Sequence, residues 1–315
     1  MLPPQYGGGI FYKEQAMKVL NFGSLNIDYV YSVDHFVKKG ETVTATARNV
    51  FPGGKGLNQS IALKRAGCEV YHAGCVGEID GSLLIHTLEQ DNIPAQYIIK
   101  RTNIASGHAI IQNDKDGDNC IIIFGGANQT ITEEDIDNTL ADFEQNDWIV
   151  LQNEISNMPY ILRTAKNKGM NVVLNPSPFK KEILTWPLDC IDVLILNEGE
   201  AAAFSMDTTE NNIDDLIKGL RASGIRAGIL LTLGDNGSVF DNDAKRIRQG
   251  IYETKVVDTT AAGDTYTGYF IASVLLGKSI EESMDMASKA SAIAVSRSGA
   301  TPSIPFRNEV DAWTF

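Results

Sequence analysis

The chain is organised around residues 257–265, which read VDTTAAGDT. The run after this stretch carries apolar residues at helical spacing as far as Gly277, namely Phe270, Ile271, Val274 and Leu275. We therefore predict a tight turn at residues 261–263 that opens a helix, with Asp264 in its first turn. First-turn N–H groups lack partners within a helix, and the helix dipole favours negative charge nearby. The stretch suits deprotonation of a hydroxyl beside a bound anion; the alternative is that Asp264 is only a favourable acid at a helix start.

The composition is that of an ordinary globular protein. The chain has 315 residues, of which 43% are hydrophobic and 21% charged, so it can bury a full core. Its net charge of -13 disfavours binding to nucleic acid or to an anionic membrane. The 4 cysteines lack metal-site spacing, which suits reduced thiols in the cytoplasm. No stretch reaches about 18 apolar residues, so we expect no membrane span.

The first residues differ in composition from the rest. They include Pro3-Pro4 and a run of three glycines at residues 7–9, without the basic and apolar regions of a signal peptide. We expect residues 1–16 to be a flexible extension. Residues 17–315 are then expected to form a single α/β domain.

Two polar motifs lie in the first part of this domain. Val19–Phe22 predicts a strand, and Asn26 and Asp28 beyond it lie on one side of the chain if that segment is extended. Asn and Asp also favour turns, which is the alternative explanation. Residues 53–59 read GGKGLNQ, and their glycines open a predicted helix and permit close approach by a ligand. The spacing matches neither a Walker A loop nor GxGxxG, so this motif is a polar-ligand loop or simply a tight connection.

Four nearly continuous apolar runs indicate strands that are buried on both faces of a parallel sheet: residues 148–151, 172–174, 193–196 and 228–233. Helical patterns lie between them, which predicts a three-layer, doubly wound and mostly parallel α/β sheet. Such sheets bind ligands at the carboxyl ends of their strands. Polar residues follow the runs at these ends, namely Glu154, Asn175, Asn197, Glu200 and Asp235.

A different pattern interrupts the strand–helix alternation. Residues 108–112 and 120–124 are strand-like and flank Asp116-Gly117, which is a hairpin signal. These residues and the β-like segment before them are expected to form a small antiparallel sheet from about residues 27–48 and 104–126. This sheet is either a lid over a site or a plain edge hairpin.

Four motifs occur in collinear order between about residues 19 and 306: GSLNID at 23–28, GGKGLNQ at 53–59, NEGE at 197–200 and DTTAAGDT at 258–265. With them the chain resembles the PfkB-type carbohydrate kinases, and within that family the ribokinase-like members. The resemblance implies an ATP-dependent kinase that phosphorylates the primary hydroxyl of a pentose, with D-ribose as the first expectation. Deoxyribose, another sugar or a nucleoside are the alternative substrates.

The resemblance also implies roles for single residues. Asp264 is expected to be the catalytic base, and the backbone of Ala261, Ala262 and Gly263 the anion hole. The sugar is expected to contact Asp264 and the following residues: Asn26, Asp28, Gly54, Lys55, Gly56, Asn58 and Glu154. ATP is expected to contact the following residues: Asn197, Glu200, Thr232, Gly234, Asp235, Gly237, Gly263 and Ser288. Ser288 stands where such kinases often have Asn in the adenine pocket.

Metal sites and assembly follow from the same resemblance. Asn197 and Glu200 are expected to serve Mg²⁺ through water. An activating K⁺ is expected at the following residues: Asp258, Thr260, Ala294, Arg297, Gly299 and Ser303. The β lid is expected to join two chains in a homodimer.

Two other function classes compete with a kinase. A non-catalytic sugar-binding regulator with the same fold is disfavoured because Asp264 and its small-residue turn are intact. A nicotinamide-dependent oxidoreductase is disfavoured because its glycine fingerprint is missing.

Overall fold

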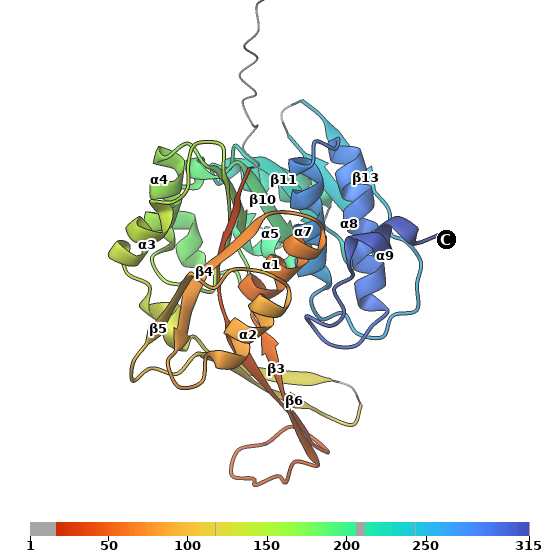
Figure 1. The fold of residues 1–315 in the computed structure, drawn as a ribbon. Coiled ribbons are helices and arrows are strands. Elements are labelled where there is room, and N and C mark those ends of the chain that lie inside the picture. Colours follow the sequence, from red (N-terminus) through yellow and green to blue (C-terminus); the bar gives the residue numbers. More distant parts are fainter. Residues whose placement is uncertain (1–16, 117, 206–211, 243, 315) are drawn as a thin grey trace, which may run out of the picture.

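The computed structural model describes residues 17–116, 118–205, 212–242 and 244–314, and every structural statement below concerns these residues (Figure 1). The expectation of a flexible extension at residues 1–16 lies outside the described residues. Within the described part of the chain, no helix is both long enough and apolar enough to cross a bilayer.

A nine-stranded sheet runs through the molecule, in the order β13-β12-β11-β10-β9-β8-β1-β4-β5. Its strands are β1 (Val19–Phe22), β4 (Val70–Gly77), β5 (Tyr97–Arg101), β8 (Trp148–Gln152), β9 (Asn171–Asn175), β10 (Val193–Asn197), β11 (Gly228–Thr232), β12 (Ser238–Asp241) and β13 (Arg246–Gln249). All neighbours from β11 to β5 are parallel, and only β12 and β13 pair antiparallel. The predicted mostly parallel sheet is confirmed, and each of the four apolar runs is one of its strands.

Helices cover both faces of this sheet, which makes three layers (Figure 1). One face packs against α1 (Lys55–Arg65), α2 (Ser82–Gln90), α7 (Ala262–Leu275), α8 (Ile280–Val295) and α9 (Arg307–Ala312). The other packs against α3 (Glu133–Leu140), α4 (Met158–Asn167), α5 (Glu198–Ser205) and α6 (Ile213–Ala222). Short 3-10 helices lie between these elements: η1 (Gly126–Thr130), η2 (Lys181–Thr185), η3 (Leu188–Cys190) and η4 (Gly234–Asn236). Side chains alternate along each strand, so Leu20 joins one core and Val19 the other.

The contact between α1 and α7 positions the site. At Gly268 in α7, an added Cβ would lie 2.4 Å from Cβ of Ala62 and 2.8 Å from N of Leu63. A side chain at Gly268 would therefore force the two helices apart. Glycine at this position lets α7 lie directly against α1. As a result, the first turns of both helices lie next to each other at the same edge of the sheet.

A second, four-stranded sheet projects from the main body and lies at the lower end of Figure 1. It contains β2 (Asn26–Ser32), β3 (Ala47–Gly53), β6 (Gly107–Asn113) and β7 (Asn119–Phe124) in the order β3-β2-β6-β7. The predicted small sheet is confirmed, but the expectation that it is antiparallel is wrong for β2 and β6, which are parallel. The reason is that β2 follows β1 and β6 follows β5, and β1 and β5 run in the same direction in the main sheet.

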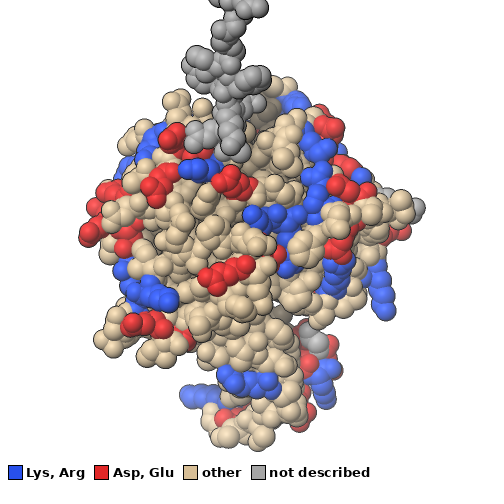
Figure 2. Space-filling model, in the orientation of Figure 1, with Lys and Arg blue, Asp and Glu red and all other residues tan. Residues whose placement is uncertain are grey.

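The edge strand β7 leaves large apolar side chains in solvent. Ile122 and Ile123 are each 59% exposed, and Phe124 is 53% exposed. On the face seen in Figure 2, Lys, Arg, Asp and Glu side chains occur in small groups among uncharged residues. The exposed strand β7 is therefore a run of large apolar side chains in water, and such surfaces mark interaction sites.

Candidate active site

The first turn of α7 has the form that the sequence predicts. Ala261 precedes the helix with φ 60° and ψ 9°, a left-handed conformation that costs a non-glycine residue about 1–2 kcal/mol. The amide of Ala262 donates to the carbonyl of Thr259 at 3.2 Å. The amides of Gly263 and Asp264 donate no hydrogen bond to any other described residue. Two free N–H groups at the start of a helix can form an anion-binding site.

Asp264 is 8% exposed and is held by two consecutive residues of α1. Nδ2 of Asn58 donates to its Oδ2 at 2.9 Å, and Nε2 of Gln59 donates to its Oδ1 at 2.9 Å. Each carboxylate oxygen therefore has an amide donor. Two amide donors fix the plane of the carboxylate and accept no proton from it, so this carboxylate is arranged as a proton acceptor.

A second carboxylate, Asp28, lies next to Gly53 across the β2–β3 pair. A Cβ on Gly53 would lie 2.1 Å from Oδ2 of Asp28, so only glycine leaves room for this carboxylate. Burial, together with the charge of Glu154, raises the pKa of Asp28 to about 7. Asp28 therefore changes its charge within the physiological range.

Asn26, the partner of Asp28 in the sequence motif, is oriented by Asn128 of η1. Nδ2 of Asn128 donates to Oδ1 of Asn26 at 2.8 Å. Asn128 is itself fixed, because its Oδ1 accepts from the amide of Leu25 at 3.1 Å. With its oxygen occupied, Asn26 has its Nδ2 group left to donate to a ligand.

Glu154 lies between the two glycine-containing motifs. Its Oε2 accepts from the hydroxyl of Ser24 and, at 3.1 Å, from the amide of Lys55. Burial raises the pKa of Glu154, and the Ser24 hydroxyl and Lys55 offset this only in part. Gly56 in the first turn of α1 also donates its amide to Oγ of Ser24, at 3.2 Å. The predicted sugar residues of both motifs are thus joined through Ser24.

Lys55 supplies positive charge to this acidic group. Burial lowers its pKa, but the carboxylates of Asp264, Glu154 and Glu200 outweigh burial and raise the pKa overall. Lys55 is therefore an ammonium group whose charge interacts with three carboxylates. Asp264 and Glu154 are predicted sugar ligands and Glu200 is a predicted ATP ligand, so the charge of Lys55 acts on both groups of predicted ligands.

A cavity of about 790 Å³ opens beside the start of α7. It is lined by seven of the residues predicted for ATP: Asn197, Thr232, Gly234, Asp235, Gly237, Gly263 and Ser288. Glu200 is not among the lining residues. It pairs with Asn197 instead, since the Asn197 amide donates to Oε2 of Glu200 at 3.1 Å and the Glu200 amide to Oδ1 of Asn197 at 2.8 Å.

Much of the cavity wall comes from residues that sequence reasoning missed. The segment 251–256 between β13 and α7 has no regular structure, and five of its residues line the cavity: Ile251, Tyr252, Glu253, Thr254 and Val256. Ser288 donates its hydroxyl to the carbonyl of Gly250 at 2.8 Å and so ties this segment to α8. The sequence feature that could have indicated this part of the wall is the presence of two large apolar residues, Ile251 and Val256, in a segment without a helix or strand pattern.

The residues predicted for K⁺ meet between the VDTT segment and the end of α8. Oδ1 of Asp258 accepts from the amide of Thr260 at 2.9 Å, and Oδ2 accepts from the amide of Gly299 at 2.8 Å. The amide of Asp258 reaches the carbonyl of Val295 at 3.2 Å, next to Ala294. The side chain of Arg297 turns away to Glu309 at 2.6 Å, so this residue has only its carbonyl to offer.

Ser303 is fully buried and completes this set of residues. Its hydroxyl donates to the carbonyl of Ala300 at 2.7 Å. Burial opposes ionisation of Asp258, but its bonds from Thr260 and Gly299 outweigh burial and lower its pKa. One carboxylate that remains charged, in a segment that lies against the carbonyl of Val295, suits a monovalent cation bound by oxygen.

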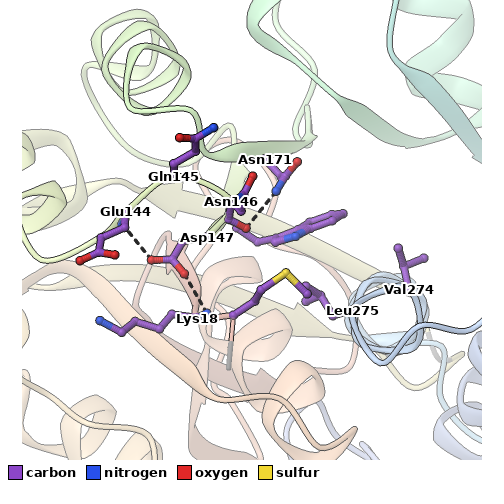
Figure 3. A pocket seen from close by; sticks show the side chains of 10 residues that line it. Lys18, Glu144, Gln145, Asn146, Asp147, Asn171, Val274 and Leu275 are labelled. Carbon is purple, nitrogen blue, oxygen red and sulfur yellow. Dashed lines mark hydrogen bonds between the residues drawn. The ribbon is translucent and has the colours of Figure 1, made fainter. Parts of the chain in front are cut away.

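A further cavity of about 540 Å³ lies at the opposite edge of the main sheet, where β1, β8 and β9 begin (Figure 3). Several of its polar groups have local partners. Asp147 accepts from the amides of Lys18 at 3.0 Å and Glu144 at 2.9 Å, and Asn171 donates to the carbonyl of Asn146 at 3.0 Å. Doubly wound sheets bind ligands at the other ends of their strands. We therefore assign the site to the edge that holds Asp264.

Comparisons with known proteins agree with this geometry. The chain matches the pfkB family of carbohydrate kinases over residues 16–307. It is 34% identical to ribokinase from Staphylococcus aureus over 305 residues, which are 93% of this chain and 98% of the relative. The structure of ribokinase from Thermotoga maritima is similar with a TM-score of 0.83 and 37% identity, over 94% of this chain and 98% of that one. Ribokinase from Arabidopsis thaliana, complexed with ribose and ATP, gives a TM-score of 0.83 and 30% identity over the same shares. The chain belongs to the PfkB family of carbohydrate kinases.

Proposed function

We propose that this chain is an ATP-dependent kinase that transfers the γ-phosphoryl group of ATP to the primary hydroxyl of D-ribose and forms D-ribose 5-phosphate. One observation carries the proposal: Asp264 is bonded to Asn58 of the predicted sugar loop, while its neighbour Gly263 lines the cavity of about 790 Å³. A proton acceptor thus lies between the predicted sugar residues and a cavity large enough for a nucleotide. The similarity to ribokinases, one of them solved with ribose and ATP, supports both substrates.

The chemistry follows from this arrangement. The oxygen of the sugar hydroxyl forms a bond to the γ-phosphorus of ATP while Asp264 accepts the proton of that hydroxyl. At the same time, the bond from the γ-phosphorus to the β-phosphate oxygen breaks, and ADP is released. The free amides of Gly263 and Asp264 stabilise the charge on the moving phosphoryl group. Lys55 adds a positive charge from the side of α1.

Sugar recognition uses directed hydrogen bonds. Asn26 donates through Nδ2, since Asn128 occupies its oxygen, and Asp28 and Glu154 accept from hydroxyls. A site built to bond a hydroxyl discriminates strongly against an analogue that lacks it. Deoxyribose, other pentoses and nucleosides remain the alternative substrates, because one hydroxyl decides between them.

Two metal ions complete the proposal. Asn197 and Glu200 would hold Mg²⁺ through water, and the charge of the ion would neutralise the ATP phosphates. Glu200 has an oxygen for this task, because its pairing with Asn197 uses Oε2 and leaves Oε1. Asp258, Thr260 and Gly299 would hold K⁺ with the carbonyls around them. Because the same segment leads into Ala261, a cation there would stiffen the anion-binding turn.

The small sheet and the location of the protein are further parts of the proposal. Residues 17–315 act as one domain in which the four-stranded sheet closes over the sugar. Its exposed apolar strand β7 pairs with a second copy of the chain, since a monomer would leave this edge in water. Reduced cysteines and ATP use both suit the cytoplasm.

A sugar panel tests the function. ATP consumption with ribose, deoxyribose, other pentoses and nucleosides should show the highest kcat/KM for ribose. Asp264→Asn should lower kcat by about 10³-fold, because the general base is lost, and leave the Kd for ribose within about threefold. Asp214→Asn, a first-turn acid of α6, is the matched control and should behave as wild type. Efficient turnover of another sugar but not ribose would refute the substrate, and an active Asp264→Asn variant would refute the base.

The titration of Asp28 predicts how ribose binding depends on pH. Its pKa of about 7 means that the carboxylate, the form that accepts hydroxyl hydrogens, is lost as the pH falls below 7. The KM for ribose should therefore rise roughly tenfold between pH 8 and pH 6. Asp28→Asn should have a high KM with little dependence on pH. A wild-type KM that is constant over this range, or an equal slope in Asp28→Asn, would contradict the role of Asp28.

Potassium should activate the enzyme more than sodium. At equal ionic strength, kcat in KCl should exceed kcat in NaCl by about fivefold or more. Asp258→Asn should remove most of this difference, since the only carboxylate of the proposed cation site is then gone. Equal rates of the wild-type protein in both salts would argue against a potassium site.

The proposed dimer depends on β7. Sedimentation velocity at micromolar concentration should show a dimer for the wild-type chain. Ile122 and Ile123 point to opposite faces of the small sheet, because side chains alternate along a strand. Only one of the two variants Ile122→Glu and Ile123→Glu should therefore convert the dimer to a monomer. The variant that does so identifies the face of the small sheet that is buried in the dimer. A wild-type monomer at all these concentrations excludes the dimer.

A further inference from the structure

A chain of buried amide side chains lies beneath Asp264. Gln59 is fully buried, and its Nε2 donates to Oδ1 of Asp264 at 2.9 Å and to Oδ1 of Asn175 at 3.2 Å. Oε1 of Gln59 accepts from Nε2 of Gln152 at 2.7 Å. Because Gln59 has no exposed surface, it cannot contact the sugar. Its only contact with the reaction is through Asp264.

The orientation of the Gln59 amide is fixed by its neighbours. Gln152 also donates to Oδ1 of Asn21 at 3.0 Å, so both of its hydrogens are used. Asn21 in turn donates to the carbonyl of Gly56 at 2.7 Å and to Oγ of Ser60 at 2.8 Å. If the Gln59 amide turned over, its oxygen would face two acceptor oxygens, and its NH₂ group would face the NH₂ group of Gln152. No hydrogen bond would survive this rotation.

We infer that Gln59 is a positioning residue for the Asp264 carboxylate, and that Gln152 fixes the orientation of Gln59. This rests on the proposed role of Asp264 as the base. Asn58 holds Oδ2 of Asp264 but is itself a predicted sugar ligand, whereas Gln59 is fully buried, so Gln59 is the holder that has no second task toward the sugar. Misplacement of a reacting group by about 1 Å can cost about 100-fold in rate.

Gln59→Met is the direct test, because methionine has a similar length and no donor. The variant should lose about 10- to 100-fold in kcat, while the KM for ribose stays within about threefold. A crystal structure of the variant should show the Asp264 carboxylate rotated away from its wild-type plane. If Gln59→Met does not fold, Gln152→Met should lower kcat in the same direction but by less, since it removes the donor to Oε1 of Gln59 and leaves the bonds of Gln59 to Asp264 and Asn175.

Gln59→Glu gives a readout that a packing role would not produce. It places a second carboxyl group within hydrogen-bond distance of Asp264, and two adjacent buried carboxyl groups share a proton that is lost only at higher pH. Lys55 and Glu154, which interact electrostatically with Asp264, are unchanged in this variant. The acid limb of the kcat profile should therefore move to higher pH by about one unit or more. An unmoved profile would overturn the inference.

Ser60→Ala is the matched control. Ser60 follows Gln59 in α1 and is equally buried, but its hydroxyl contacts Asn21 and His72 rather than Asp264. Asn21 keeps its bond to Gly56, so kcat should stay within about threefold of wild type. Wild-type kcat in Gln59→Met, or an unmoved carboxylate in its crystal structure, would overturn the inference. A wild-type protein without kinase activity would refute the proposed function instead, and the crystal structure would still decide the role of Gln59.

Discussion

The site depends on a buried carboxylate that must be supplied with hydrogen-bond donors. Asp264 is 8% exposed, and a carboxylate in that position is stable only when its oxygens are bonded. The donors come from α1, more than 200 positions earlier in the chain, with separations of 206 and 205 residues. The approach of α7 to α1 at Gly268 makes these bonds possible. Packing between two helices therefore determines where the proton acceptor lies.

Much of the fold is readable from local patterns. Continuous apolar runs indicated the central strands, and small residues before an amphipathic run indicated the start of α7, because both patterns depend on neighbours in the chain. The parallel pairing of β2 with β6 was missed, since it depends on where β1 and β5 end in space. The four motifs located Asp264, Asn26 and Asn197. Gln152 and Asn128 carry no local signal, because a buried amide and a surface amide look alike in sequence, and only the folded chain brings them to their partners.

The charge of the site differs from that of the whole chain. The protein carries a net charge of -13, yet the proposed function requires it to bind the phosphates of ATP. The positive potential is local: it comes from Lys55 and from two free amides at the start of α7. In the proposed function, the acidic residues would serve the sugar and the metal, and Lys55 and the free backbone amides would serve the phosphates.

The short link between β1 and β2 has a mechanical consequence. β1 ends at Phe22 and β2 begins at Asn26, so residues 23–25 form the shorter of two direct links between the main sheet and the small one; residues 102–106, between β5 and β6, form the other. A rotation of the small sheet would bend the chain at both links, and the shorter one contains Ser24, whose hydroxyl bonds Glu154 and accepts from Gly56. Ser24 would then be both a hinge of that rotation and the residue that joins the two motifs of the proposed sugar site. Opening the small sheet would strain the bonds of Ser24 to Glu154 and Gly56, so the position of the sheet and the arrangement of the proposed site are mechanically coupled.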